Sequence, residues 1–462
     1  MRTTRVAAAT LGVALAVAAC SSSSRPDFKA PPSTTTPTTS NAPSPLSSWT
    51  TYHHDAARTG YSDDQAEAGQ VHKAWETPAL DGDVYTEPLV VGGRRVIAAT
   101  EANSVYAFDP VTGAQVWRAQ LGTPVNGASL PCGDIDPSGI TGTPVADPTS
   151  NTLYTVAFLA AGTHHELFAL DASNGAVRWH RAIDPPGLAG RVEQERGALT
   201  IANGRVYVPY GGLFGDCGPY KGAIVSSALD GRGDLQSYIV PTTREAGIWH
   251  PGGPVVDRKG DLWVSTGNSD STGNFDYGNA VVHLSPQLKS LDFFAPTNWL
   301  ALNGSDTDLG SMGPALAGAD RVVAAGKDGI AYLLDRAHLG NIGGAITSRR
   351  VCNGSAFGTA AVLGSTVYVP CTDGLVAVAS VGDELAPPAW RRPGRAGPPI
   401  VTGALVWDLF GDGTLVALDL ATGQQRFSTQ VDAPASRFVS LSAATGRLFV
   451  APKDTVMAFA LR

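Results

Sequence analysis

Short stretches in which hydrophobic and polar residues alternate recur along the chain at intervals of several tens of residues. Three segments, 105–117, 167–179 and 415–427, share one pattern: an alternating apolar run, the motif Asp-x-x-Thr/Asn-Gly, and a second run with an aromatic residue. Alternation predicts β-strands, and the motif suits a tight turn, because Asp binds backbone amides and Gly accepts a positive φ. Each copy is therefore predicted to be a β-hairpin, and the repetition predicts an architecture of stacked units.

Eight runs rich in valine, leucine and aromatic residues mark the second strand (B) of a four-stranded unit, A to D. These runs are 95–99, 153–156, 206–209, 262–265, 322–325, 367–370, 405–408 and 448–451. The eighth unit ends at its C strand, and segment 71–80, with Trp75 placed like Trp117, matches the missing D strand. The sequence predicts an all-β fold over residues 49–462: an eight-bladed β-propeller of four-stranded antiparallel blades, closed by an N-terminal strand, because closure removes exposed edges.

The connections between the predicted strands differ in length on the two faces of the ring. The A–B and C–D turns, which share one face, are short, as at Gly92–Gly93 and Thr112–Gly113. The long connections are all B–C or D–A loops: 122–141, 184–197, 211–222, 241–252, 267–279 and 294–312. Long loops on a rigid scaffold commonly hold binding residues. This long-loop face is therefore predicted to bind a protein or a small-molecule ligand.

The residues before the propeller have the features of an export signal and a tether. Residues 1–19 combine a charged start with an apolar run too short to span a bilayer. Small residues before Cys20 resemble the bacterial lipobox, which implies a lipoprotein signal peptide and a lipid on Cys20; a plain secretory signal is the alternative. Residues 20–48, rich in Ser, Thr and Pro, are predicted to be a disordered tether. We expect an exported protein, lipid-anchored to the outer side of the bacterial cell membrane.

Charge and cysteine content narrow the class of partner. The net charge is −8 with 16% charged residues, which argues against nucleic acid, and we expect a monomer. Four cysteines remain beyond Cys20, an even number that suggests two disulfide bonds in an exported chain. Three pairings are open. The preferred one joins Cys132 to Cys217 and Cys352 to Cys371.

The repeated phrase also carries a resemblance to a known family. Tyr/Phe-Ala-x-Asp-x-x-Thr/Asn-Gly-x-x-x-Trp, as in 106–117, resembles the repeat of pyrroloquinoline-quinone (PQQ) propellers, and Trp49-x-x-Tyr-His-His-Asp-x-x-Arg-Thr-Gly60 resembles their opening segment. The family includes PQQ-dependent alcohol dehydrogenases and cofactor-free scaffolds such as the propeller lipoprotein of the outer-membrane assembly machine. The resemblance covers nearly everything from residue 49, and it implies the fold while leaving the function open.

Five residues match positions that act in the enzymes of this family. The resemblance implies that Trp249 stacks under the quinone, that Asn268 binds Ca²⁺, and that Lys327 contacts the quinone oxygens. It implies that Asp306 or Asp308 is the catalytic base. Each residue also has a structural alternative: a loop aromatic for Trp249, a turn residue for Asn268, loop caps for the two aspartates, and an exposed turn lysine for Lys327.

The chain departs from the enzymes at several points. They add a Glu to the Ca²⁺ ligands from the preceding blade, whereas residues 210–222 contain none; Asp216 could substitute only if this insertion folds inward. The sequence has no adjacent Cys-Cys pair and no Cys-x-x-Cys-His haem site. The favoured interpretation is a binding or interaction scaffold at the cell envelope. The alternative is a PQQ- and Ca²⁺-dependent alcohol or sugar dehydrogenase.

Overall fold

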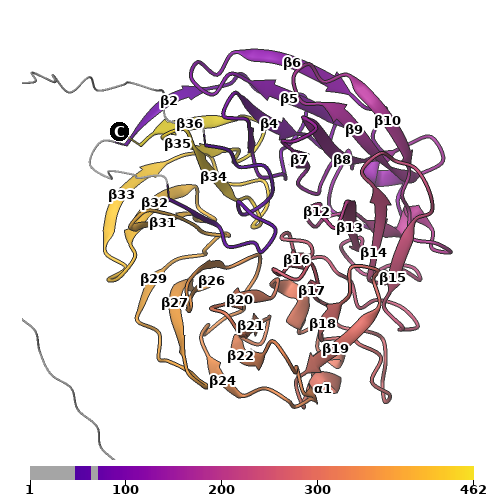
Figure 1. Cartoon of the computed structure of the whole chain (residues 1–462), viewed down its shortest axis with the longest axis vertical. Coiled ribbons are helices and arrows are strands. Elements are labelled where there is room, and N and C mark those ends of the chain that lie inside the picture. Colours follow the sequence, from indigo (N-terminus) through magenta and orange to yellow (C-terminus); the bar gives the residue numbers. More distant parts are fainter. Residues whose placement is uncertain (1–46, 64–70, 462) are drawn as a thin grey trace, which may run out of the picture. The chain divides into compact units, whose positions relative to one another are not determined.

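Eight four-stranded antiparallel sheets follow one another around a ring in the computed structural model, which describes residues 47–63 and 71–461 (Figure 1). The eight-bladed propeller predicted from the sequence is confirmed. The expected signal peptide, Cys20 and the tether up to residue 46 lie outside the described residues. Ser47, at the end of the predicted tether, accepts a hydrogen bond from the Thr445 backbone N–H.

Within the described part of the chain, no helix is both long and apolar enough to cross a membrane.

From strand A to strand D, blade 1 contains β3 (Leu89–Val91), β4 (Arg95–Ala99), β5 (Ser104–Phe108) and β6 (Gln115–Gln120), and blade 2 contains β7 (Val145–Asp147), β8 (Thr152–Leu159), β9 (His164–Asp171) and β10 (Val177–Ala182). Blade 3 contains β12 (Thr200–Ala202), β13 (Arg205–Gly212), β14 (Ala223–Ala228) and β15 (Gln236–Ile239), and blade 4 contains β16 (Val255–Val256), β17 (Leu262–Ser265), β18 (Val281–Leu284) and β19 (Ser290–Ala295). Blade 5 contains β20 (Ala315–Ala317), β21 (Arg321–Ala325), β22 (Ile330–Asp335) and β24 (Thr347–Arg350), and blade 6 contains β25 (Ala361–Leu363), β26 (Thr366–Cys371), β27 (Gly374–Val381) and β29 (Trp390–Pro393). Blade 7 contains β30 (Ile400–Thr402), β31 (Leu405–Leu409), β32 (Thr414–Asp419) and β33 (Gln425–Gln430), and blade 8 contains β34 (Leu441–Ala444), β35 (Arg447–Val450), β36 (Met457–Ala460) and β2 (His72–Glu76). Additional short elements are β1 (Tyr61–Ser62), β11 (Glu193–Gln194), β23 (Asn341–Ile342), β28 (Glu384–Leu385), α1 (Trp299–Gly304) and the 3₁₀ turns Gly127–Ser129, Gly190–Val192 and Leu309–Ser311.

An N-terminal strand closes the ring, as predicted. β2 pairs antiparallel with β36, with His72 opposite Ala460 and Glu76 opposite Met457. The eighth sheet therefore takes three strands from the C-terminal end of the chain and its outer strand from the start of the propeller. Pairing satisfies the edge of β36, which would otherwise present unpaired backbone groups.

Tryptophans of the repeat pack against glycines of the next blade. A Cβ on Gly113, in the C–D turn of blade 1, would lie 2.7 Å from the Trp75 ring of blade 8, so only glycine leaves room for the indole. The Trp75 Nε1–H also donates to the Pro110 carbonyl at 3.1 Å. The same fit recurs in the pairs Trp117–Gly175, Trp179–Gly231 and Trp390–Gly423. The Asp-x-x-Thr/Asn-Gly phrase thus joins neighbouring blades in addition to turning the chain.

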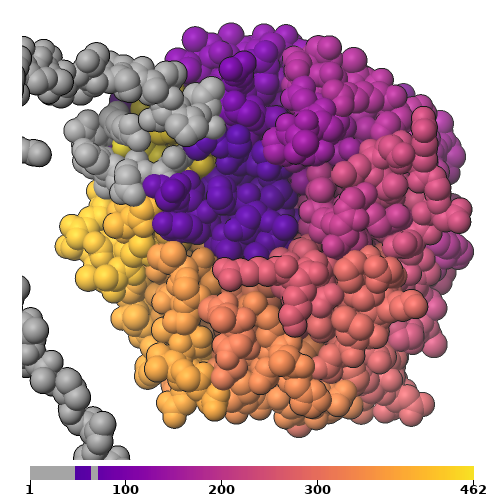
Figure 2. Space-filling model, viewed as in Figure 1, coloured from indigo at the N-terminus to yellow at the C-terminus, as the bar shows by residue number. Residues whose placement is uncertain are grey.

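The opening segment, residues 49–62, runs along the inner strands of the ring. Its backbone forms hydrogen bonds with Val90 of blade 1, Ala146 of blade 2, Val256 of blade 4, Val362 of blade 6 and Val401 of blade 7. It ends in β1, which pairs parallel with β30. Indigo N-terminal residues accordingly lie at the centre of the face seen in Figure 2. This lead-in segment connects inner strands from most of the blades.

Arg58 anchors the lead-in segment in the interior. Its side chain is buried, and the guanidinium donates to the carbonyls of Gly252 at 2.7 Å, Leu199 at 3.0 Å and Tyr52 at 3.0 Å. It also donates to the hydroxyls of two threonines, Thr51 and Thr200. Five donor groups are needed to satisfy these acceptors, and arginine is the side chain that carries them in a fixed plane.

We expect Arg58→Met to lower the free energy of unfolding by at least about 3 kcal/mol, because it leaves several buried acceptors without donors. Urea unfolding followed by tryptophan fluorescence measures the change. Arg94→Met, at the exposed A–B turn of blade 1, is the matched control and should leave the midpoint within experimental error. Equal midpoints for the two variants would contradict the anchoring role of Arg58.

Candidate functional site

A cavity of about 700 Å³ lies where the long loops of the ring converge. Each of the eight connections from one blade to the next supplies at least one lining residue, which places the cavity over the ring axis. These residues are Tyr85, Asp134, Gln194, Arg196, Gly247, Trp249, Asp306, Asp308, Phe357, Arg395, Ala435, Ser436, Arg437 and Phe438. The B–C loops of blades 3, 4 and 5 supply the remainder. The long-loop face therefore carries an axial pocket.

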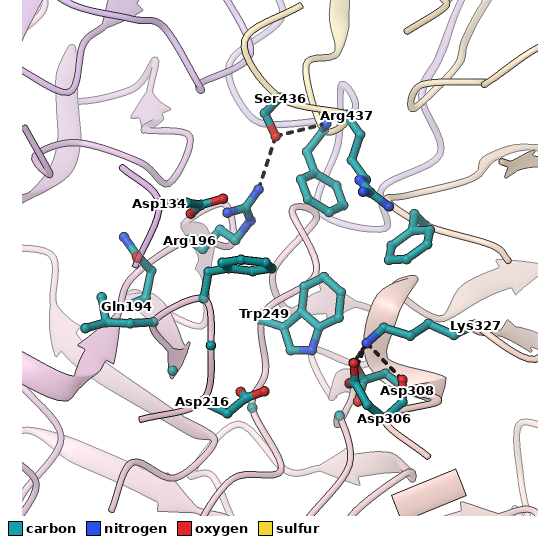
Figure 3. Close-up of a pocket in the computed structure, with 18 of the residues that line it drawn as sticks. Asp134, Gln194, Arg196, Asp216, Trp249, Asp306, Asp308, Lys327, Ser436 and Arg437 are labelled. Atoms are coloured by element: carbon teal, nitrogen blue, oxygen red, sulfur yellow. Dashed lines mark hydrogen bonds and ion pairs between the residues drawn. The ribbon is translucent and has the colours of Figure 1, made fainter. Parts of the chain in front are cut away.

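All six residues singled out from the sequence as site candidates line this axial pocket. They lie in separate loops of blades 3 to 5 and their junctions: Asp216 between β13 and β14, Trp249 between β15 and β16, Asn268 between β17 and β18, Asp306 and Asp308 between α1 and β20, and Lys327 between β21 and β22. Figure 3 shows Trp249 at the centre of the group. The insertion at 210–222 reaches the pocket, so Asp216 folds inward.

Trp249 lies on a floor of glycine. A Cβ on Gly211 would lie 3.0 Å from the Trp249 Cβ, and a Cβ on Gly267 would lie 3.0 Å from the indole nitrogen. The rings of Phe357 and Phe438 lie 6.3 and 6.1 Å from the indole, at steep angles. The indole is held in place by backbone and aromatic neighbours, and it remains partly exposed to the cavity.

Lys327 links the two candidate aspartates. Its Nζ lies 2.7 Å from Asp308 and 2.6 Å from Asp306, and 5.8 Å from the centre of the Trp249 ring. The Asp308 side chain is 4% exposed whereas that of Asp306 is 68% exposed, so the two carboxylates differ in environment. Burial raises the pKa of Asp308, although Lys327 opposes the shift. Burial alone would lower the pKa of Lys327, but the two aspartates hold it above its usual value.

Asn268 lies next to the buried aspartate, because its backbone N–H donates to Asp308 Oδ1 at 2.6 Å. Its side-chain amide donates to Glu245 at 3.4 Å. The Asp216 carboxylate accepts the hydroxyl of Tyr220 at 2.5 Å, and Glu245 forms an ion pair with Arg244 at 2.6 Å. Two carboxylates, those of Asp308 and Glu245, therefore contact Asn268, and Asp216 lines the same pocket.

Glu245 is a site residue that sequence reasoning missed. The resemblance implies a carboxylate from residues 210–222, whereas Glu245 comes from the D–A loop four residues before Trp249. Burial raises the pKa of Glu245, and the neighbouring carboxylates of Asp216 and Asp308 add to the shift while Arg244 opposes it. Its signal in the sequence was its proximity to Trp249.

The two preferred disulfide bonds are present. Cys132 of the β6–β7 loop is bonded to Cys217 of the β13–β14 loop, and Cys352 to Cys371. The first bond ties together two long loops from different blades, both of which contribute to the pocket. The side chain of Phe214, three residues from Cys217, is 72% exposed at the pocket.

Two clusters of potential metal ligands occur in the described residues, and neither belongs to the pocket. One is Cys352, Cys371 and Asp373, whose two sulfurs are joined in a disulfide bond. The other is Asp257, Asp261 and His283 on blade 4.

Comparison with known proteins supports the resemblance on which these residues were chosen. Residues 65–211 match the family model described as outer membrane protein assembly factor BamB. The chain carries PQQ-like propeller repeats. No curated protein matches the sequence significantly.

Solved structures with the same fold include dehydrogenases and a BamB protein. A quinohemoprotein alcohol dehydrogenase from Comamonas testosteroni superposes with a TM-score of 0.69 and 18% identity, covering 90% of this chain and 80% of that one. A europium-containing methanol dehydrogenase gives 0.67 and 14%, covering 90% and 98%. BamB from Moraxella catarrhalis gives 0.55 and 16%, covering 84% and 97%. At these identities the likeness establishes the propeller fold alone.

We expect Lys327→Met to reduce stability by about 3 kcal/mol, because it leaves the Asp308 carboxylate buried without its cation. Asp306→Asn is the matched control. It removes the other, exposed partner of Lys327, and its effect should stay below about 1 kcal/mol. Urea midpoints at neutral pH measure both changes. If the two variants are equally stable, Lys327 does not serve to neutralise Asp308.

Proposed function

We propose that this protein is an exported, lipid-anchored propeller of the cell envelope that binds a small molecule in its axial pocket. The convergence of all six candidate residues on one cavity of about 700 Å³ carries the proposal. This volume is in the range of ligand pockets, and the lining combines aromatic rings with a few charged groups, which is typical of small-molecule sites. A protein partner docking on the same long-loop face would instead require a broader surface.

A second candidate function is that of a PQQ- and Ca²⁺-dependent alcohol or sugar dehydrogenase. The residues fit a planar quinone in two respects: the Trp249 indole, set on its glycine floor, offers a flat platform, and Lys327 lies above that ring. The oxygen donors of Asn268, Asp308 and Asp216 suit a hard cation such as Ca²⁺. Glu245, beside Asn268, offers the glutamate that residues 210–222 lack.

In this candidate function the bound cofactor supplies an electron acceptor, and the chain supplies position and charge. Trp249 would hold the cofactor, and Lys327 would place a positive charge beside it. Asp308, held by the Asn268 N–H, or the more exposed Asp306 accepts the proton of a substrate hydroxyl. The rings of Phe357 and Phe438 add apolar surface beside Trp249.

Titration of the purified protein with PQQ, with and without Ca²⁺, tests both functions at the same pocket. A saturable change in quinone absorbance and a rise in melting temperature are expected for a quinone site. Trp249→Ala should weaken binding about tenfold through loss of stacking. Asn268→Ala should remove the Ca²⁺ dependence, whereas Asn174→Ala, at an exposed turn of blade 2, should change neither.

Failure of PQQ to bind at high micromolar concentration would contradict the dehydrogenase function. A screen of other small molecules by melting temperature would then test the binding function on its own, with Trp249→Ala as the variant that should lose the response.

The membrane anchor is tested at Cys20. Fractionation of bacteria that express the full chain should place the protein with the membranes, and Cys20→Ser should release it into the soluble or secreted fraction, because the lipid is attached through the thiol. Ser21→Ala is the matched control and should remain with the membranes. Membrane retention of the Cys20→Ser protein would show that another segment holds it there.

A further inference from the structure

Three arginines, Arg196, Arg395 and Arg437, line the axial pocket and are here called the arginine wall. They come from the D–A connections before blades 3, 7 and 8, far apart in sequence. Figure 3 shows the labelled Arg196 and Arg437 on the opposite side of Trp249 from Asp216, Asp306 and Asp308, which we call the acidic wall. The pocket therefore has arginines on one side and, on the other, three aspartates of which two are paired with Lys327.

Within the described residues, no member of the arginine wall forms an ion pair with a carboxylate, whereas Arg118, Arg178 and Arg426 each pair with an aspartate at 2.5–2.8 Å. Asp134 also lines the pocket and is the acid that favours the charge of Arg196 most strongly, without reaching ion-pair distance. For Arg437, the charged groups that act on its pKa are the other two arginines of the wall. In a chain of net charge −8, this local excess of positive charge stands out.

Aromatic rings hold two of the guanidinium groups. The Arg196 Cζ lies 4.3 Å from the centre of the Phe438 ring, and the Arg437 Cζ lies 4.4 Å from that of Phe357. A guanidinium that stacks on a ring keeps the N–H donors at its edge available for a carboxylate or phosphate. Arg196 has in addition a buried Nε without a partner, while its Nη2 donates to Ser436 at 3.2 Å.

The three positive charges also repel one another. Partial burial lowers the pKa of Arg437, and Arg395 and Arg196 lower it further. Keeping like charges together costs free energy in the absence of an anion, and an anionic group between them removes that cost. Clusters of this kind occur where a protein binds negatively charged ligands.

We propose that the arginine wall binds the acidic group of a small hydroxyl-bearing acid, whose hydroxyl groups face the acidic wall and whose body lies over Trp249. This inference rests on the proposed use of the axial pocket as a ligand site, and it adds the chemical class of the ligand. A carboxylate and a phosphate monoester share the required charge and geometry. A neutral sugar or alcohol would leave the arginine wall unpaired.

Calorimetric titration with D-glucuronate, D-glucose 6-phosphate and D-glucose at low ionic strength tests the inference, since the three differ mainly in the acidic group. At least one acid should bind at least tenfold more tightly than glucose, with an affinity that falls as salt is added. The preferred acid distinguishes a carboxylate site from a phosphate site. Binding of all three with equal affinity, or of none, would overturn the inference.

The double variant Arg395→Gln, Arg437→Gln should weaken binding of the preferred acid at least tenfold and leave its melting temperature in the absence of ligand nearly unchanged, because both side chains are exposed. Arg94→Gln, which removes a positive charge from the opposite face, is the control and should leave acid binding unchanged. Unchanged acid binding by the double variant would overturn the inference. Binding of PQQ but of neither acid would overturn the inference and support the dehydrogenase candidate. Binding of an acid but not of PQQ would support the inference and contradict the dehydrogenase candidate.

Discussion

The ring depends on the fit of an indole against a glycine turn of the next blade, found at four of the eight junctions. Burying a tryptophan side chain contributes several kcal/mol, on the order of 3–5 from large-to-small substitutions. Because the glycine admits the ring only in the absence of a side chain, the contact also sets the distance between blades. At the last junction, Trp75 of β2 fits against Gly113, so the same contact that spaces the blades completes the circle.

A ring spaced in this way brings loops from every blade to one axis. Tyr85 and Phe438 lie at opposite ends of the propeller sequence, yet both line the pocket. The acidic wall comes mainly from blades 3 to 5 and their junctions, and the arginine wall from other connections, so their charges stay apart because separate rigid sheets hold them. Changes in these loops leave the contacts between blades intact. The fold can therefore support catalysis in one protein and assembly in another.

The repeat made the fold predictable from sequence, because the alternating second strand recurs eight times, the turn motif recurs three times, and Trp75 marks the strand that completes the last blade. The site was partly predictable: Trp249, Asn268 and Lys327 occur in recognisable local phrases, and the structure brings them together. Glu245 and the arginine wall were missed, since their proximity to the pocket depends on how loops of different blades pack. Contacts between loops of different blades cannot be predicted from a local sequence pattern.

The path of the lead-in segment constrains the order in which the molecule can assemble. Residues 49–62 are the first part of the propeller to be synthesised, yet they form hydrogen bonds with inner strands as late in the chain as Val401. Likewise, β2 pairs with β36, near the C-terminal end of the chain. The contacts of the N-terminal segments with blades 6, 7 and 8 can therefore form only when nearly the whole chain is available. The ring therefore closes only after β36 has been made, so the first strand of the propeller is among the last to find its partner.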